Sequence, residues 1–152
     1  ISEDYRDVNT DKMLVDAMTT RMVLYPKSID TVVASNLHAD ILTDLAASLS
    51  GSMGIAPTAN LDPDKRHPSM FEPIHGSAFD IMGKGIANPI GSYWSAVLML
   101  ENLGELQAAQ KLMFAIEKLT EDKKVLPKDL GGKSTTKQIT KAMIDIISGK
   151  NN

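Results

Sequence analysis

Residues 36–54 read NLHADILTDLAASLSGSMG, and this stretch decides how the chain is organised. Asn36 can cap a helix over residues 37–49, in which apolar side chains recur at helical spacing. Gly51 ends that helix. From Gly51 to Pro89 five glycines and five prolines interrupt the chain, which predicts a long loop-rich segment with short strands.

Upstream of this stretch, residues 11–24 predict a helix that begins at Thr10 or Asp11 and stops before Pro26. Its apolar side chains point in nearly every direction, which is typical of a helix buried on most sides. Residues 29–34 form a short run rich in β-branched side chains, and this composition predicts a buried strand.

Downstream of Pro89, apolar spacing predicts helices over residues 92–103 and 105–119, followed by a last helix capped by Thr135 or Thr136. The change in composition near Gly51 separates two parts, residues 1–50 and residues 51–152.

Composition excludes several classes of protein. The net charge is −3 with scattered basic residues and few aromatic ones, so we expect no nucleic-acid partner. No apolar run approaches the roughly 18 residues of a membrane span, and the first residues do not resemble a signal peptide. Cysteine is absent, which excludes disulfides and a thiol nucleophile and is compatible with the cytoplasm. Because Ile1 is not an initiator methionine, we expect a C-terminal piece of a longer protein.

Three aspartates are candidate metal ligands in the two predicted N-terminal helices. Asp40 and Asp44 are four residues apart, so both carboxylates lie on one helix face, at the edge of its packed side. Mg²⁺ or Mn²⁺ would keep both ionised there, whereas the alternative is a solvated surface pair. Asp16 lies among apolar residues of its helix and needs a partner, either an arginine such as Arg21 or a metal ion.

Four runs of the sequence stand out together: NLHADILTD at 36–44, GSMG at 51–54, FEPIHGSA at 71–78 and GKGIANP at 83–89. In this order they resemble the metal-dependent β-decarboxylating dehydrogenases, a family that includes isopropylmalate, isocitrate, and tartrate or D-malate dehydrogenases. The similarity extends from residues 15–18 to the run Asp-Leu-Gly-Gly at 129–132, and the loop over residues 63–70 and Phe79 are most similar to the tartrate/D-malate branch. The resemblance implies the C-terminal part of an isopropylmalate dehydrogenase-like α/β fold, in which helices pack on a mixed sheet that is incomplete without the N-terminal half.

By this resemblance, Asp16, Asp40 and Asp44 match the three metal-binding aspartates of the family, with Asp16 reaching the site from the other subunit of a homodimer. The dimer would bury the two N-terminal helices in a four-helix interface. The implied reaction oxidises a 2-hydroxy acid at C2 with NAD and then releases CO₂. The divalent ion stabilises the enolate that results.

The resemblance also places the nucleotide on residues 72–88, although no G-x-G-x-x-G motif follows a strand. From the residues alone, His75 fits a turn and Asp80 a helix cap. In the family reading, Asp80 accepts hydrogen bonds from ribose hydroxyls and repels the 2′-phosphate of NADP, so the expected cofactor is NAD. The matching cofactor-binding residues are Glu72, His75, Gly76, Ser77, Ala78, Asp80 and Asn88.

No catalytic acid or base is assigned, because the tyrosine and lysine of the family belong to an N-terminal half that has no counterpart here. We therefore expect the C-terminal portion of a cytoplasmic NAD- and Mn²⁺/Mg²⁺-dependent enzyme acting on tartrate or D-malate, inactive by itself. Two alternatives stay open. One is an isopropylmalate dehydrogenase, and the other is a non-catalytic fragment that serves only as a dimerisation module.

Overall fold

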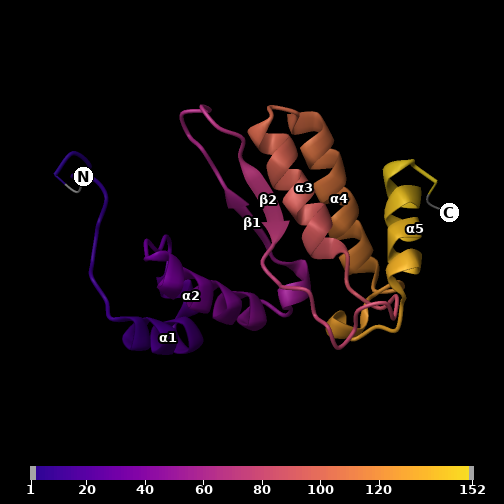
Figure 1. The fold of residues 1–152 in the computed structure, drawn as a ribbon, viewed down its shortest axis with the longest axis horizontal. Helices are drawn as coiled ribbons and strands as arrows, with labels where there is room; N and C mark the ends of the chain where they lie inside the picture. Colours follow the sequence, from indigo (N-terminus) through magenta and orange to yellow (C-terminus); the bar gives the residue numbers. More distant parts are fainter. Residues whose placement is uncertain (1–2, 151–152) are drawn as a thin grey trace. The chain divides into compact units, whose positions relative to one another are not determined.

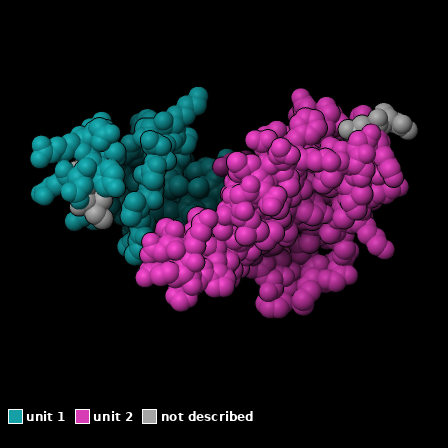
Figure 2. Space-filling model, turned by 90° about the horizontal axis from the view of Figure 1, so that it is seen from above, with its two compact units in different colours: residues 1–49 teal, residues 50–152 magenta. Residues whose placement is uncertain are grey.

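The computed structural model describes residues 3–150, and its internal contacts divide the chain into two compact units. Unit 1 comprises residues 1–49 and unit 2 residues 50–152, coloured separately in Figure 2. Within the described range, no helix has both the length and the apolar character that crossing a bilayer requires.

Unit 1 consists of helix α1 (Val15–Leu24), a 3-10 turn (Pro26–Ser28) and helix α2 (Asn36–Leu49), labelled in Figure 1. The predicted start of the first helix at Thr10 or Asp11 is wrong, because the Asp11 carboxylate contacts the Arg21 guanidinium at 3.3 Å instead of capping the helix. The second helix starts one residue earlier than predicted, since Asn36 is its first residue and the Ser35 carbonyl accepts the Ala39 N–H at 2.8 Å.

The predicted buried strand over residues 29–34 is also wrong. These residues are irregular, and the side chain of Val33 is 96% exposed. A strand needs a neighbour that accepts its hydrogen bonds, and no described segment pairs with this one. Helix α1 has no buried side chain either, with Leu14 before it and Leu24 at its end 72% and 60% exposed. Among residues 3–49, the buried apolar side chains are therefore those of Leu42 and Ala47 on α2.

Unit 2 begins with a 3-10 turn (Met53–Ile55) and a hairpin of strands β1 (Pro57–Asn60) and β2 (Met70–Pro73). The strands are antiparallel, with Pro57 opposite Pro73 and Asn60 opposite Met70. The predicted loop-rich segment with short strands is confirmed. The mixed sheet is not formed by residues 3–150, because these two strands pair only with each other.

Three helices complete unit 2: α3 (Ile90–Asn102), α4 (Leu106–Asp122) and α5 (Thr136–Ile147), with a 3-10 turn (Lys128–Leu130) before α5. All three were predicted. Thr135 caps α5 through a capping box with Gln138. Helix α3 packs against both α4 and the hairpin, and α4 packs against α5 (Figure 1). The core between these helices contains Ile90, Val97, Ala109, Ala115, Ile116, Leu119, Ile139 and Met143.

Candidate functional site

A cleft of about 980 Å³ lies in unit 2, where the irregular segment before α3 meets the turns that precede the hairpin and α5. Its lining is rich in glycine, alanine and serine, which leaves backbone groups accessible to a ligand. The lining residues are Ser52, Met53, Gly54, His75, Gly76, Ser77, Ala78, Ile81, Met82, Gly83, Gly85, Ile86, Ala87, Asn88, Lys128, Asp129 and Thr136.

Five of the seven predicted cofactor-binding residues line this cleft, namely His75, Gly76, Ser77, Ala78 and Asn88. Glu72 does not, because it is an exposed residue of strand β2. Asp80 is exposed in the turn between lining residues Ala78 and Ile81, and it caps no helix. Five of the predicted residues therefore line one cleft together, whereas the two acidic ones, Glu72 and Asp80, are not part of its lining.

The loop holds an unusual backbone conformation where it borders the cleft. Gly83 and Gly85 have φ angles of 77° and 65°, which glycine adopts readily. Ala78 has a φ of 43°, in the left-handed region that a residue with a Cβ seldom occupies. Such strain persists only where surrounding structure imposes it, and it is concentrated at ligand sites.

One carboxylate oxygen joins three separate segments at the floor of the cleft. Asp129 Oδ2 accepts hydrogen bonds from the Ser52 hydroxyl and, at 2.8 Å, from Asn88 Nδ2. The Ser52 oxygen also accepts the Gly54 N–H at 2.9 Å. A Cβ at position 54 would lie 2.6 Å from Asp129 Oδ2, so only glycine allows this approach.

A second tether fixes the same loop to the start of α5. The backbone N–H of Thr136 donates to the Gly85 carbonyl at 2.9 Å, and its hydroxyl donates to the Ala87 carbonyl at 2.5 Å. The last quarter of the chain thus holds the loop over residues 85–88 from two points, Asp129 and Thr136.

Sequence reasoning assigned no ligand-binding role to Ser52, Lys128, Asp129 or Thr136, although all four line the cleft. Ser52 belonged to a run that carried the family resemblance, and Asp129 begins the short run Asp-Leu-Gly-Gly. The position of Ser52 and Asp129 within runs that match the family was the sequence signal that could have marked them as site residues. Their contact with a loop some 40 residues away could not be inferred from spacing.

The predicted metal ligands all belong to unit 1. Asp40 and Asp44 are exposed on α2 at a spacing that places both on one face of the helix. Asp16 is exposed in the first turn of α1, where its Oδ1 accepts the Ala17 N–H at 2.8 Å. Residues 3–150 of a single chain contain no group of three or more acidic or histidine side chains that could hold a metal.

Arg21 was the alternative partner for Asp16, and it is engaged elsewhere. Its guanidinium contacts Asp11 at 3.3 Å and donates to the hydroxyl and carbonyl of Ser28 at 2.9 and 2.7 Å. Among the described residues, the structure therefore does not support an ion pair between Arg21 and Asp16. The exposed carboxylates provide the hard oxygen donors that Mg²⁺ and Mn²⁺ prefer.

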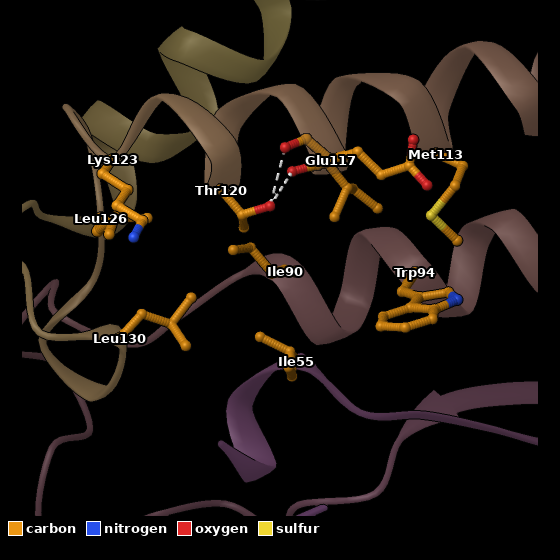
Figure 3. A pocket seen from close by; sticks show the side chains of 10 residues that line it. Ile55, Ile90, Trp94, Met113, Glu117, Thr120, Lys123, Leu126 and Leu130 are labelled. Atoms are coloured by element: carbon orange, nitrogen blue, oxygen red, sulfur yellow. Dashed lines mark hydrogen bonds between the residues drawn. The ribbon is translucent and has the colours of Figure 1, made fainter. Parts of the chain in front are cut away.

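A second cavity, of about 440 Å³, lies beside α3 and α4 in unit 2 (Figure 3). Most of its lining is apolar and includes Ile55, Ile90 and Trp94, and the lining also contains Glu117, Thr120 and Lys123. The Thr120 hydroxyl donates back to the carbonyls of Ile116 and Glu117 at 2.9 and 3.0 Å, so it is not available to a ligand as a donor. Ile90 and Ile116 belong both to this lining and to the core of unit 2, so the cavity borders the core.

The chain belongs to the isocitrate/isopropylmalate dehydrogenase family, whose model matches residues 1–147. A probable tartrate dehydrogenase/decarboxylase of Agrobacterium vitis is 60% identical over 99% of this chain and 42% of that protein. The D-malate dehydrogenase [decarboxylating] of Escherichia coli is 43% identical over 97% of this chain and 42% of its own length. The chain thus spans about two fifths of the curated relatives it matches.

Solved structures show the same fold. The isocitrate dehydrogenase of Methylococcus capsulatus is 38% identical with a TM-score of 0.91, and the match covers 97% of this chain and 43% of that one. A β-decarboxylating dehydrogenase of Thermococcus kodakarensis is 34% identical with a TM-score of 0.78, over 96% and 42% of the two chains. The isopropylmalate dehydrogenase-like fold that the sequence motifs implied is therefore confirmed.

Proposed function

We propose that this chain supplies the nucleotide cleft and the metal-binding aspartates of a cytoplasmic enzyme that oxidatively decarboxylates a 2-hydroxy acid of the tartrate or D-malate type, using NAD. The proposal rests on a single observation: the loop that matches the family's cofactor residues lines a glycine-rich cleft of about 980 Å³. The identity of 43–60% to tartrate and D-malate dehydrogenases supports the choice of substrate class.

The residues of the cleft fit a dinucleotide. Gly76, Ser77 and Ala78 line the cleft and carry small side chains or none, which would let a cofactor approach their backbone, and Asn88 lines the same cleft. Asp80, exposed in the adjoining turn, would accept hydrogen bonds from ribose hydroxyls and repel a 2′-phosphate. These features bind and orient the cofactor, and they favour NAD over NADP.

The aspartates of unit 1 fit a hard divalent cation by their chemistry, since each offers exposed carboxylate oxygens. Asp40 and Asp44 would hold the ion from one protomer and Asp16 from its partner. When bound, Mn²⁺ or Mg²⁺ supplies Lewis acidity toward the hydroxyl and carboxylate of the substrate. The proton-transfer groups belong to the part of the relatives that this chain does not cover.

The exposed apolar side chains of unit 1 support the homodimer in this proposal. Ile41 on α2 is about half exposed, and burying such a side chain against a second copy is favourable. In the full-length protein, Ile41→Asp should weaken dimerisation at least about 100-fold, measured by sedimentation equilibrium. Gln110→Asp, on the exposed face of α4, is the matched control and should leave the dimer intact. An unchanged dimer in the Ile41 variant would contradict this interface.

The direct test is an assay of the full-length protein with NAD and Mn²⁺ against tartrate, D-malate and isopropylmalate. We expect turnover and CO₂ release with tartrate or D-malate. Preference for isopropylmalate would reassign the substrate, and a folded dimer inactive on all three would favour the alternative of a dimerisation module.

A further inference from the structure

The hydrogen bonds around Asp129 fix the orientation of the Asn88 side chain. Asn88 Oδ1 accepts the Ile90 N–H at 2.9 Å at the start of α3, so the amide nitrogen must face the other way. That nitrogen donates to Asp129 Oδ2 at 2.8 Å. Both ends of the amide are therefore held, one by the helix start and the other by a carboxylate 41 residues further along the chain.

The same carboxylate oxygen also determines how closely the neighbouring turn approaches. Ser52 is 8% exposed, and its hydroxyl donates to Asp129 while accepting the Gly54 N–H. Gly54 lies so close that a Cβ there would be 3.1 Å from Asn88 Cβ. Hydrogen bonds to a charged acceptor are stronger than neutral ones, and here two converge on one oxygen.

We propose that Asp129 is a positioning residue for cofactor binding, which acts by holding the Asn88 amide and the Ser52–Gly54 turn in the geometry that receives the nucleotide. This inference rests on the proposed function, because it assigns the cleft to NAD. Without Asp129, the Asn88 amide loses one of its two anchors and can turn away from its binding orientation. The Ser52 hydroxyl then loses its acceptor as well.

The test measures the dissociation constant of NAD and the kcat of the full-length protein. Asp129→Ala should raise the Kd about 10- to 50-fold and leave kcat at saturating NAD within about threefold. Asp129→Asn keeps an oxygen that both donors can share, so it should recover most of the lost affinity. Asp122→Ala, which removes an exposed carboxylate at the end of α4, is the matched control and should bind NAD normally.

A double-mutant cycle separates positioning from a general loss of structure. If Asp129 acts through Asn88, the variant with both Asn88→Ala and Asp129→Ala should bind NAD about as weakly as Asn88→Ala alone. The proposal would be overturned if the two substitutions raised the Kd of NAD by independent factors that multiply in the double variant. It would also be overturned if Asp129→Asn bound NAD as weakly as Asp129→Ala. If Asp129→Ala does not fold, the cycle cannot be measured and Asp129→Asn alone is the test: a Kd for NAD raised as much as in Asn88→Ala would overturn the proposal.

Failure of this inference differs from failure of the proposed function. Wild-type affinity in Asp129→Ala would refute the positioning role and leave the assignment of the cleft to NAD intact. A wild-type protein that shows no binding of NAD at millimolar concentration would refute that assignment and, with it, the role of Asp129.

Discussion

The two units of this chain contain similar apolar residues but bury them to different extents. Unit 2 buries them between α3, α4 and α5, where Val97 is 1% exposed and Ile139 fully covered. Unit 1 leaves comparable side chains open, so that α1 has none that is buried and Val33 is 96% exposed. Unit 2 thus carries its own hydrophobic stabilisation, whereas most of the apolar surface in the described part of unit 1 is not covered by this chain. The comparison teaches that apolar content alone does not locate a core.

The largest expected effect lies in unit 1 and concerns activity. In the full-length protein, Asp40→Asn should lower kcat/KM at saturating Mn²⁺ by about 10³-fold or more, because the proposed metal ligand loses its charge. The melting temperature should change by less than about 2 °C, since the side chain is exposed. Asp30→Asn, another exposed carboxylate of unit 1, should stay within about twofold of wild type. Unchanged turnover in Asp40→Asn would remove this residue from the ligand set.

A matched pair of valine truncations tests the contrast in burial directly. Val97→Ala should lower the free energy of unfolding by about 2–3 kcal/mol, because the methyl groups it removes are packed in the core of unit 2. Val33→Ala removes the same atoms from an exposed segment and should cost less than about 0.5 kcal/mol. Both are measured by urea denaturation of this chain. Equal losses would show that residues 29–34 are covered in solution.

A charge reversal at the rim of the cleft should have an intermediate effect. Asp80→Lys in the full-length enzyme should shift the ratio of kcat/KM for NAD over NADP about 10- to 100-fold toward NADP, because a cation attracts the 2′-phosphate that a carboxylate repels. Steady-state kinetics with both cofactors measure the shift. Glu101→Lys, an exposed change on α3, is the control, and a shift of the same size there would mean that overall charge is responsible.

The smallest effect is expected on the exposed face of α4. Hydrogen bonds and charge attraction from Asp122, and then from Glu121, raise the pKa of Lys118 above its ordinary value of 10.5. A raised pKa means that the stabilisation is present below pH 10.5 and is lost as the pH rises past the raised value. Lys118→Gln should therefore lower the melting temperature at pH 8 by about 1 °C or less and make no difference at more alkaline pH. A difference that grew with pH would contradict this sign.

The helices of unit 2 were predictable because their signals are local. Apolar spacing in α3 and α4 and the capping box at Thr135 need only neighbouring residues. In unit 1 the same reasoning found both helices but failed at the start of α1 and over residues 29–34. Asp11 has the right side chain for a helix cap, but a nearby arginine binds it, and residues 29–34 have the composition of a strand without a partner.

The candidate site also contains residues that the sequence could predict and residues that it could not. Residues 75–78 and 88 could be chosen from sequence runs alone, because a loop that presents its own backbone is encoded in one continuous stretch. Asp129 and Thr136 could not, since their importance depends on which distant backbone or side chain they reach. The assignment of Asp16, Asp40 and Asp44 to a metal stays a prediction, as does the role of Asp80.

By itself, the sequence determined the family, the helices of unit 2 and the glycine-rich loop, because each depends on residues close together along the chain. Only the tertiary structure decided which apolar residues are buried and that Asp129 holds the Asn88 amide. Burial and long-range hydrogen bonds depend on how separate segments pack together, and the spacing of residues along the chain does not specify that packing.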